Sequence, residues 1–192
     1  MIIAKSSGKE FDKFPLPEAG TTQAVCCGVW DLGMQESTFN GETKIRHKVV
    51  IAWELDQLIE APESEYNGKP YMLSKTYTLS LFENAALKKD LESWRGKSFS
   101  QDEIDNGFDI ETLYGINCLI GVAHVTKGEK TYANVSAILP PTKGMTKKIP
   151  VRAKDEAPPK WVVEKQEQAI KPESVPEMDD FPFDLPNDEA PY

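Results

Sequence analysis

Six cationic side chains within the first 130 residues have a spacing suited to contacting phosphates. Lys44, Arg46 and Lys48 occupy alternate positions of one short segment. The other three are Lys75, Lys127 and Lys130. Alternate side chains of an extended strand point to the same face at intervals of ~7 Å. Lysine and arginine in such a row can neutralise successive phosphates of a nucleic acid, so these six residues are candidate phosphate ligands.

Three aromatic residues close to these cations are candidates for stacking on nucleic-acid bases, an interaction that contributes about 1–3 kcal/mol per base. Phe39 directly precedes the turn signal Asn40-Gly41. Tyr132 alternates along its segment with polar neighbours, opposite an apolar set. Trp30 lies near the end of the first apolar segment, and it fits the hydrophobic core equally well. We therefore expect base stacking first at Phe39, then at Tyr132, then at Trp30.

Motifs for catalysis or for metal binding are missing from the sequence. It contains no GxxxxGK[ST] phosphate loop, no glycine-rich dinucleotide turn, no GxSxG and no HExxH. No CxxC pair occurs, and the two histidines are far apart. We expect no enzymatic activity, no cofactor and no metal site.

One acidic cluster leaves an alternative open, a nuclease that uses two metal ions. The same acids fall where helices are expected to begin, and there they would stabilise the helix dipole. The cluster consists of Asp102, Glu103, Asp105, Asp109 and Glu111.

The hydrophobic pattern predicts short strands with a helix among them. Apolar, β-prone segments at 24–32 and 43–55 flank the Asn40-Gly41 turn, and 43–55 has one apolar face and one that begins with the three cations. Further strands are expected at 72–82, 117–126 and 131–139, with a helix around 87–94. Three strands, a helix and two strands is the order of an OB-fold, a small five-stranded Greek-key barrel of the mainly β class. We predict this fold for residues 1–142.

An OB-fold places its ligand across strands two and three, between the hairpins that join strands one to two and four to five. The six cations map onto these strands and hairpins. We therefore expect one cationic face that binds single-stranded DNA.

Charge and proline content change sharply along the chain, whose net charge is −9. Residues 1–140 carry 14 basic and 20 acidic side chains, residues 141–171 carry 8 and 4, and residues 172–192 carry none and 7. Ten of the 14 prolines follow residue 139. We predict a flexible linker of basic and mixed charge at 143–171, with a short helix around 161–170, and an acidic tail at 172–192.

The acidic tail interleaves carboxylates with aromatic rings, which a plain solubility tail does not need. Its carboxylates would compete with DNA phosphates for the cations, and its rings would offer a partner protein an apolar contact. The candidate partner-binding residues are Asp179, Asp180, Phe181, Phe183, Asp184 and Tyr192.

Two stretches resemble known proteins. YTLSLFENAALKKDLESWRGKSF (77–99) and LIGVAHVTKGEKTYANVSAILPPTKG (119–144) are similar to a phage-encoded family of OB-fold replication and recombination proteins. MDDFPFDLP (178–186) resembles the acidic tip of bacterial and phage single-stranded DNA-binding proteins, although here nine residues follow Phe183. The resemblance implies a non-catalytic protein that coats single-stranded DNA with little sequence preference during phage DNA replication or recombination. It also implies that the tail recruits replication or recombination proteins.

Two further expectations concern location and assembly. The first residues do not resemble a secretory signal, and no run approaches the ~20 apolar residues needed to cross a bilayer, so we expect no membrane contact and a cytoplasmic location, in the host cell if the protein is phage-encoded. One OB-fold covers about 4–16 nucleotides, so tight coating would require cooperativity or a homo-oligomer.

A second class of function remains open. Residues 1–140 have more acids than bases, which favours an acidic OB-like interaction adapter, or a DNA mimic, that does not bind DNA.

Overall fold

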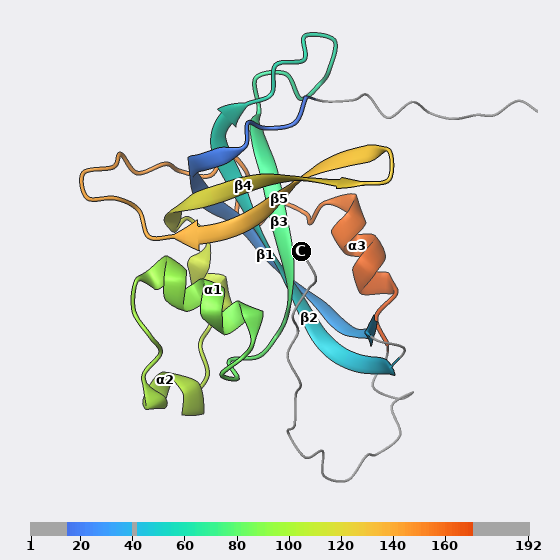
Figure 1. Cartoon of the computed structure of the whole chain (residues 1–192), viewed down its shortest axis with the longest axis vertical. Helices are drawn as coiled ribbons and strands as arrows, with labels where there is room; N and C mark the ends of the chain where they lie inside the picture. Colours follow the sequence, from blue (N-terminus) through green and yellow to red (C-terminus); the bar gives the residue numbers. More distant parts are fainter. Residues whose placement is uncertain (1–14, 40–41, 171–192) are drawn as a thin grey trace, which may run out of the picture.

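The computed structural model describes residues 15–39 and 42–170, and it confirms a mainly β protein. Five antiparallel strands form one sheet in the order β3-β2-β1-β4-β5. The sheet is strongly curved, so that its two edge strands β3 and β5 come close together (Figure 1). The strands are β1 (Gly20–Phe39), β2 (Glu42–Leu58), β3 (Pro70–Thr78), β4 (Asn117–Lys127) and β5 (Lys130–Leu139).

The helices occupy two places in the fold. Helix α1 (Ala86–Arg95), helix α2 (Gln101–Asp105) and the 3₁₀ helix η1 (Ile110–Leu113) connect β3 to β4, which agrees with the predicted order. Helix α3 (Lys160–Glu167) follows β5, where the sequence predicts a short helix. Among the described residues, no helix has the length and apolar character needed to cross a membrane.

The inner face of the curved sheet forms the main core. Val49, Ile51, Trp53 and Leu55 of β2 alternate along the strand and are all buried, as their spacing predicts. Helix α1 closes this face with three buried side chains spaced four and three residues apart. Its Trp94 packs against Trp53, with 5.8 Å between ring centroids.

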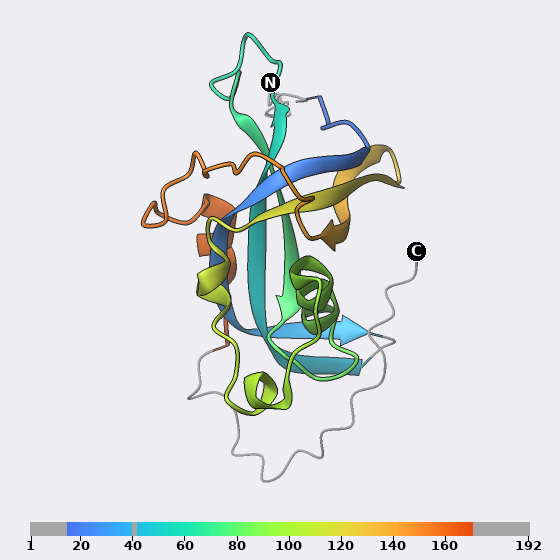
Figure 2. The ribbon, with the colours of Figure 1, turned by 90° about the vertical axis from the view of Figure 1, so that its left-hand side faces the viewer.

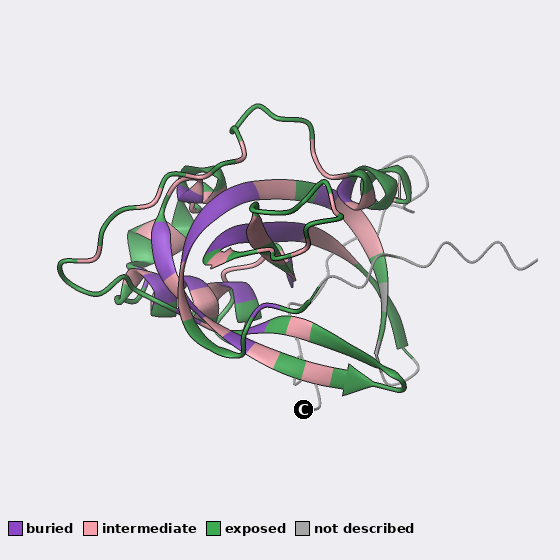
Figure 3. Cartoon of the chain, turned by 90° about the horizontal axis from the view of Figure 1, so that it is seen from above, coloured by how far each residue is buried: buried purple, intermediate pink, exposed green. Residues whose placement is uncertain are grey.

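The outer face of β1 and β2 is covered as well, by helix α3. Val162 of α3 is fully buried against Val50 of β2 and Leu32 of β1, and two tryptophans flank this cluster. Figure 2 shows α3 lying against the side of the sheet formed by β1. Because both faces are covered here, β2 is buried without interruption from Val49 to Leu55, and the exposed residues concentrate toward the hairpin tips (Figure 3).

The segment between β5 and α3, residues 140–159, crosses the outer face and is held there by two buried polar side chains. The Glu54 carboxylate accepts hydrogen bonds from the backbone N–H groups of Val151 (2.6 Å) and Arg152 (2.9 Å). The Asn117 side chain accepts from the N–H of Lys148 and donates to its carbonyl, each at 2.8 Å. We call residues 140–159 the crossing segment.

This packing differs from the flexible linker that the sequence predicts for 143–171. Residues 143–170 are anchored to the sheet through Lys148, Val151, Arg152 and helix α3, and residue 171 lies outside the described residues. The sequence prediction counted apolar residues, which are few in this segment. It did not anticipate that Glu54 and Asn117 would bind the backbone of the crossing segment, or that Val162 with Trp161 beside it would pack into the outer cluster.

We expect Glu54→Ala to lower the free energy of unfolding by about 1–3 kcal/mol, because two N–H groups of the crossing segment lose a charged acceptor. Urea unfolding measures this change. The matched control is Asp56→Ala, which removes a half-exposed carboxylate paired with Lys148 and should cost under about 1 kcal/mol. Equal losses for the two variants would contradict the proposed anchoring of the crossing segment by Glu54.

Burial of the three thiols predicts alkaline sensitivity. Burial raises the pKa of Cys26 from 9.0 to about 12, and it raises the pKa of Cys27 and Cys118 as well. The folded state therefore favours protonated thiols, so their contribution to stability is complete below pH 9 and is lost as the pH rises toward 12. Raising the pH from 8 to about 10.5 should lower the free energy of unfolding less in the Cys26→Val variant than in the unmodified protein. Urea unfolding at each pH measures this difference. An identical pH dependence in the two proteins would refute this contribution.

Candidate nucleic-acid interface

Two hairpins project from the same side of the curved sheet. The tip of the β1–β2 hairpin and the tip of the β4–β5 hairpin both point to the right in Figure 2, with β3 and helix α1 between them in this view. Figure 1 shows the same two hairpins one above the other. The space between them is the place where the sequence predicts the ligand.

The β1–β2 hairpin carries three of the predicted cations on its outer face. Opposite residues of an antiparallel pair share a face, and Lys48 and Arg46 are opposite Gly33 and Gln35, away from the core residues of β2. The structure therefore confirms that the cations of β2 lie on the face opposite the core. Lys44 is exposed and lies 3.2 Å from Glu42, so the charge of this row is partly neutralised within the hairpin.

Lys48 connects the cationic row to the polar outer face of β3. Its amino group donates to the Thr78 hydroxyl at 2.8 Å, and Ser74 and Thr76 lie on the same face as Thr78 because alternate residues share a face. These hydroxyls were not among the predicted site residues. The alternation of serine and threonine along β3 was the sequence signal that could have identified them.

Lys75 does not share this face, so the expectation of one face with six cations fails at this position. It is opposite Ile51, a core residue, and it points toward α1, where its amino group lies 2.7 Å from Asp90. The Tyr77 hydroxyl donates to the same carboxylate oxygen at 2.7 Å. Burial together with Asp90 raises the pKa of Tyr77. The prediction assigned Lys75 by its strand and did not account for which face its position occupies.

The β4–β5 hairpin presents the remaining cations and one ring. Lys127 and Lys130 are opposite each other at its tip, and both are exposed. Tyr132 lies two residues after Lys130 on the same face, with 46% of its surface exposed. These three residues form a cation–aromatic group on one side of this hairpin.

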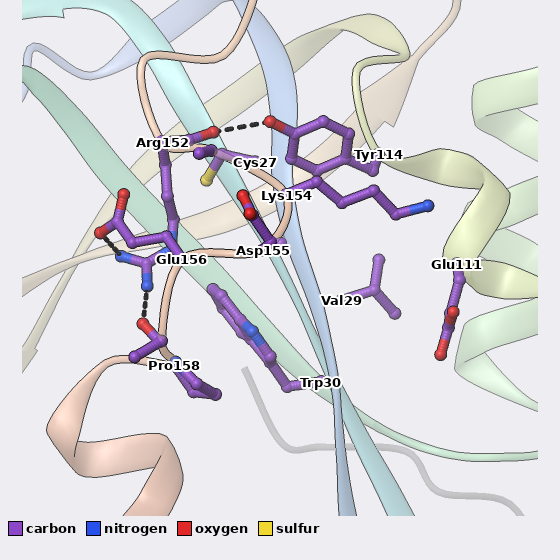
Figure 4. A pocket seen from close by; sticks show the side chains of 13 residues that line it. Cys27, Val29, Trp30, Glu111, Tyr114, Arg152, Lys154, Asp155, Glu156 and Pro158 are labelled. Atoms are coloured by element: carbon purple, nitrogen blue, oxygen red, sulfur yellow. Dashed lines mark hydrogen bonds and ion pairs between the residues drawn. The ribbon is translucent and has the colours of Figure 1, made fainter.

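Trp30 lies in the covered part of the outer face and not with Tyr132. It packs in the cluster with Val50 and Val162, and the Arg152 guanidinium lies 5.4 Å from its ring centroid. Figure 4 shows Trp30 in the wall of a cavity of about 270 Å³ that also includes Tyr114, whose hydroxyl donates to the Arg152 carbonyl at 2.7 Å. These contacts support the core interpretation of Trp30.

Several predicted site residues cannot be placed at the level of side chains. Phe39 is the last residue of β1, and its side chain is outside the description. All the predicted tail residues lie outside the described residues, namely Asp179, Asp180, Phe181, Phe183, Asp184 and Tyr192.

The acidic cluster around 102–111 is used in helix capping. The Ser100 hydroxyl and the Glu103 carboxylate form a capping box at the start of α2, and Asp109 caps η1. The hydrogen bond from the Ser100 N–H, together with Arg95, holds the pKa of Glu103 below its usual range. Within the part of the chain that the structure describes, no three His, Cys, Asp or Glu side chains are grouped so that they could hold a metal ion.

Comparison with protein-family models and with curated proteins found no match to this chain.

We expect Gly28→Ala to destabilise the protein by about 1–3 kcal/mol, because an added Cβ would lie 2.2 Å from the indole ring of Trp30. Urea unfolding followed by tryptophan fluorescence measures the loss. In a Trp30→Leu background the same change should cost less, giving a coupling energy of about 0.5–3 kcal/mol. Additive effects of the two substitutions would show that the ring does not pack over Gly28.

Proposed function

We propose that the protein is a non-catalytic single-stranded DNA-binding protein that coats DNA with little sequence preference. The observation that carries this proposal is the placement of lysines on the outer faces of two hairpins that project from the same side of the sheet. The resemblance noted in the sequence supports a role in phage DNA replication or recombination, with the acidic tail as the element that recruits partner proteins.

The proposed fold is an OB-fold. Its support is the strand order β3-β2-β1-β4-β5, the approach of β3 to β5, and the helix between β3 and β4. In such a barrel the oligonucleotide lies across β2 and β3 between the two projecting hairpins. Helix α3 covers the outer face of β1 and leaves the outer face of β3 open for this path.

The chemistry of this surface fits phosphate contact and base stacking. Five cations remain after Lys75 is set aside, and Tyr132 is an exposed ring between Lys130 and the body of β5. Ammonium and guanidinium groups bind the sugar–phosphate backbone irrespective of sequence, and every base has a face on which a ring can stack. A surface of this composition favours single strands over duplex DNA, because only single strands expose base faces.

The acidic adapter remains the second candidate, and one observation favours it. The Lys44–Glu42 pair neutralises a charge that the DNA hypothesis uses, and the Lys75–Asp90 pair removes Lys75 from the predicted cationic face. An adapter with self-neutralised hairpins would bind no DNA at any salt concentration.

The test is fluorescence anisotropy of a labelled ~30-nucleotide DNA, single- and double-stranded, with the full-length protein at about 50 mM and 200 mM salt. Five phosphate contacts predict a slope of log affinity against log salt of about −3.5, which is a loss of about 100-fold across this range. Lys130→Ala should reduce the slope by about 0.7. Tyr132→Ala should weaken binding about 5- to 150-fold, and Tyr132→Phe should retain most of the affinity because the ring remains.

The matched control is Lys160→Ala, which removes an exposed cation from α3, away from the two hairpins, and should leave the slope unchanged. A full-length protein that binds neither form of DNA at low salt would exclude the DNA-coating function and favour the adapter. Equal loss in the Lys160 and Lys130 variants would mean that the contacts are not localised on the hairpins.

A further inference from the structure

A second cavity, of about 400 Å³, lies between the end of α1, the start of β4 and the crossing segment. Its apolar wall includes Trp94, Leu113 and Met145, and Ile116 beside them has 47% of its surface exposed. A hydrophobic wall of this size next to an exposed isoleucine is suited to hold an aromatic or aliphatic side chain.

Arg95 also lines this cavity, but its guanidinium packs against residues outside the lining. Its guanidinium lies 4.3 Å from the Phe99 ring centroid and 5.2 Å from that of Phe108, and its Nη2 pairs with Glu103. Its Nη1 is buried and has no hydrogen-bond partner among the described residues. The guanidinium is already engaged by Glu103 and the two rings, so the charge offered to a ligand in the cavity comes from the crossing segment.

The rim of the cavity is cationic over the crossing segment. Residues 141–154 contain five basic side chains and no acidic one. Lys147 lines the cavity, whereas Lys148 pairs with Asp56 and Arg152 pairs with Glu156. Ile149 and Val151, in the same stretch, have 86% and 74% of their surface exposed. This stretch therefore combines positive charge with exposed aliphatic surface.

We propose that the acidic tail of the same chain, residues 172–192, docks in this cavity and along the crossing segment. The tail carries seven carboxylates and no basic residue, and Phe181 and Phe183 stand between Asp180 and Asp184. An aromatic ring flanked by carboxylates matches an apolar cavity that is bordered by Lys147.

The tail is long enough to reach the site. The described chain ends at Ile170, whose N–H donates to the Met34 carbonyl at 2.8 Å. Phe181 and Phe183 follow 11 and 13 residues later, an extended reach of about 35–45 Å. A compact domain of this size has a radius of gyration of about 15 Å and a diameter of about 40 Å. Docking here places the carboxylates away from the hairpin lysines, so the inference does not depend on DNA binding.

The experiment places a photoreactive benzophenone side chain at Phe183 of the full-length protein, without DNA, and maps the cross-links by mass spectrometry. We expect intramolecular cross-links to residues 113–117 and 141–147. Lys147→Glu and Ile116→Asp should each lower their yield by about fivefold or more, because a negative charge then faces the tail. The matched control Lys160→Glu reverses a charge that is 91% exposed on α3 and should leave the yield unchanged.

Three outcomes would overturn the proposal. Cross-links to the hairpin residues 42–48 or 127–132 would place the tail on the cationic hairpins. Cross-links only between copies, in a mixture of isotopically light and heavy protein, would make a neighbouring molecule the source of the tail. A yield that is insensitive to Lys147→Glu and Ile116→Asp would show that the cavity is not the site.

Discussion

The pairing of β1 with β2 is the constraint on which the rest of the structure depends. It runs from Ala24 and Leu55 to Phe39 and Glu42, with register shifts at Cys26/Gly28 and at Asp31/Gly33. In an antiparallel pair the register decides which residues face the core and which face outward. This one ladder therefore buries Ile51 and Trp53, and at its far end it carries Lys44, Arg46 and Lys48 outward.

The same ladder explains why the outer face has two different uses. Near the centre of the hairpin, Val50 and Leu32 are apolar on the outside, and burying them requires the Val162 side chain of α3. Toward the tip the outer residues of β2 are the cations Lys48, Arg46 and Lys44. Glu54 and Asn117 then hold the crossing segment along the body of the sheet, so that α3 reaches its place on β1 and leaves β3 uncovered.

Charge is separated along the chain and also in space. The body is acidic overall, yet lysines gather at two hairpin tips and along the crossing segment, whereas the acids near α2 and η1 cap helices. Basic side chains thus lie on the two hairpins and along the crossing segment, where Lys147 lines the cavity near Trp94. Of the two ligands proposed above, the acidic peptide is the one that the apolar wall near Trp94 suits.

The sequence by itself determined the order of strands and helices along the chain, the inner face of β2 and the outward row of cations on β2. These features follow from period-two alternation and from the Asn40-Gly41 turn, which are local signals. It also indicated the acidic tail, which is a matter of composition. Only the tertiary structure decided that Lys75 turns inward to Asp90, that Trp30 packs over Gly28, and that residues 143–170 are anchored to the sheet. Each of these depends on partners distant in sequence, and a local pattern carries no information about which distant side chain will supply an acceptor, an apolar contact or the space for a ring.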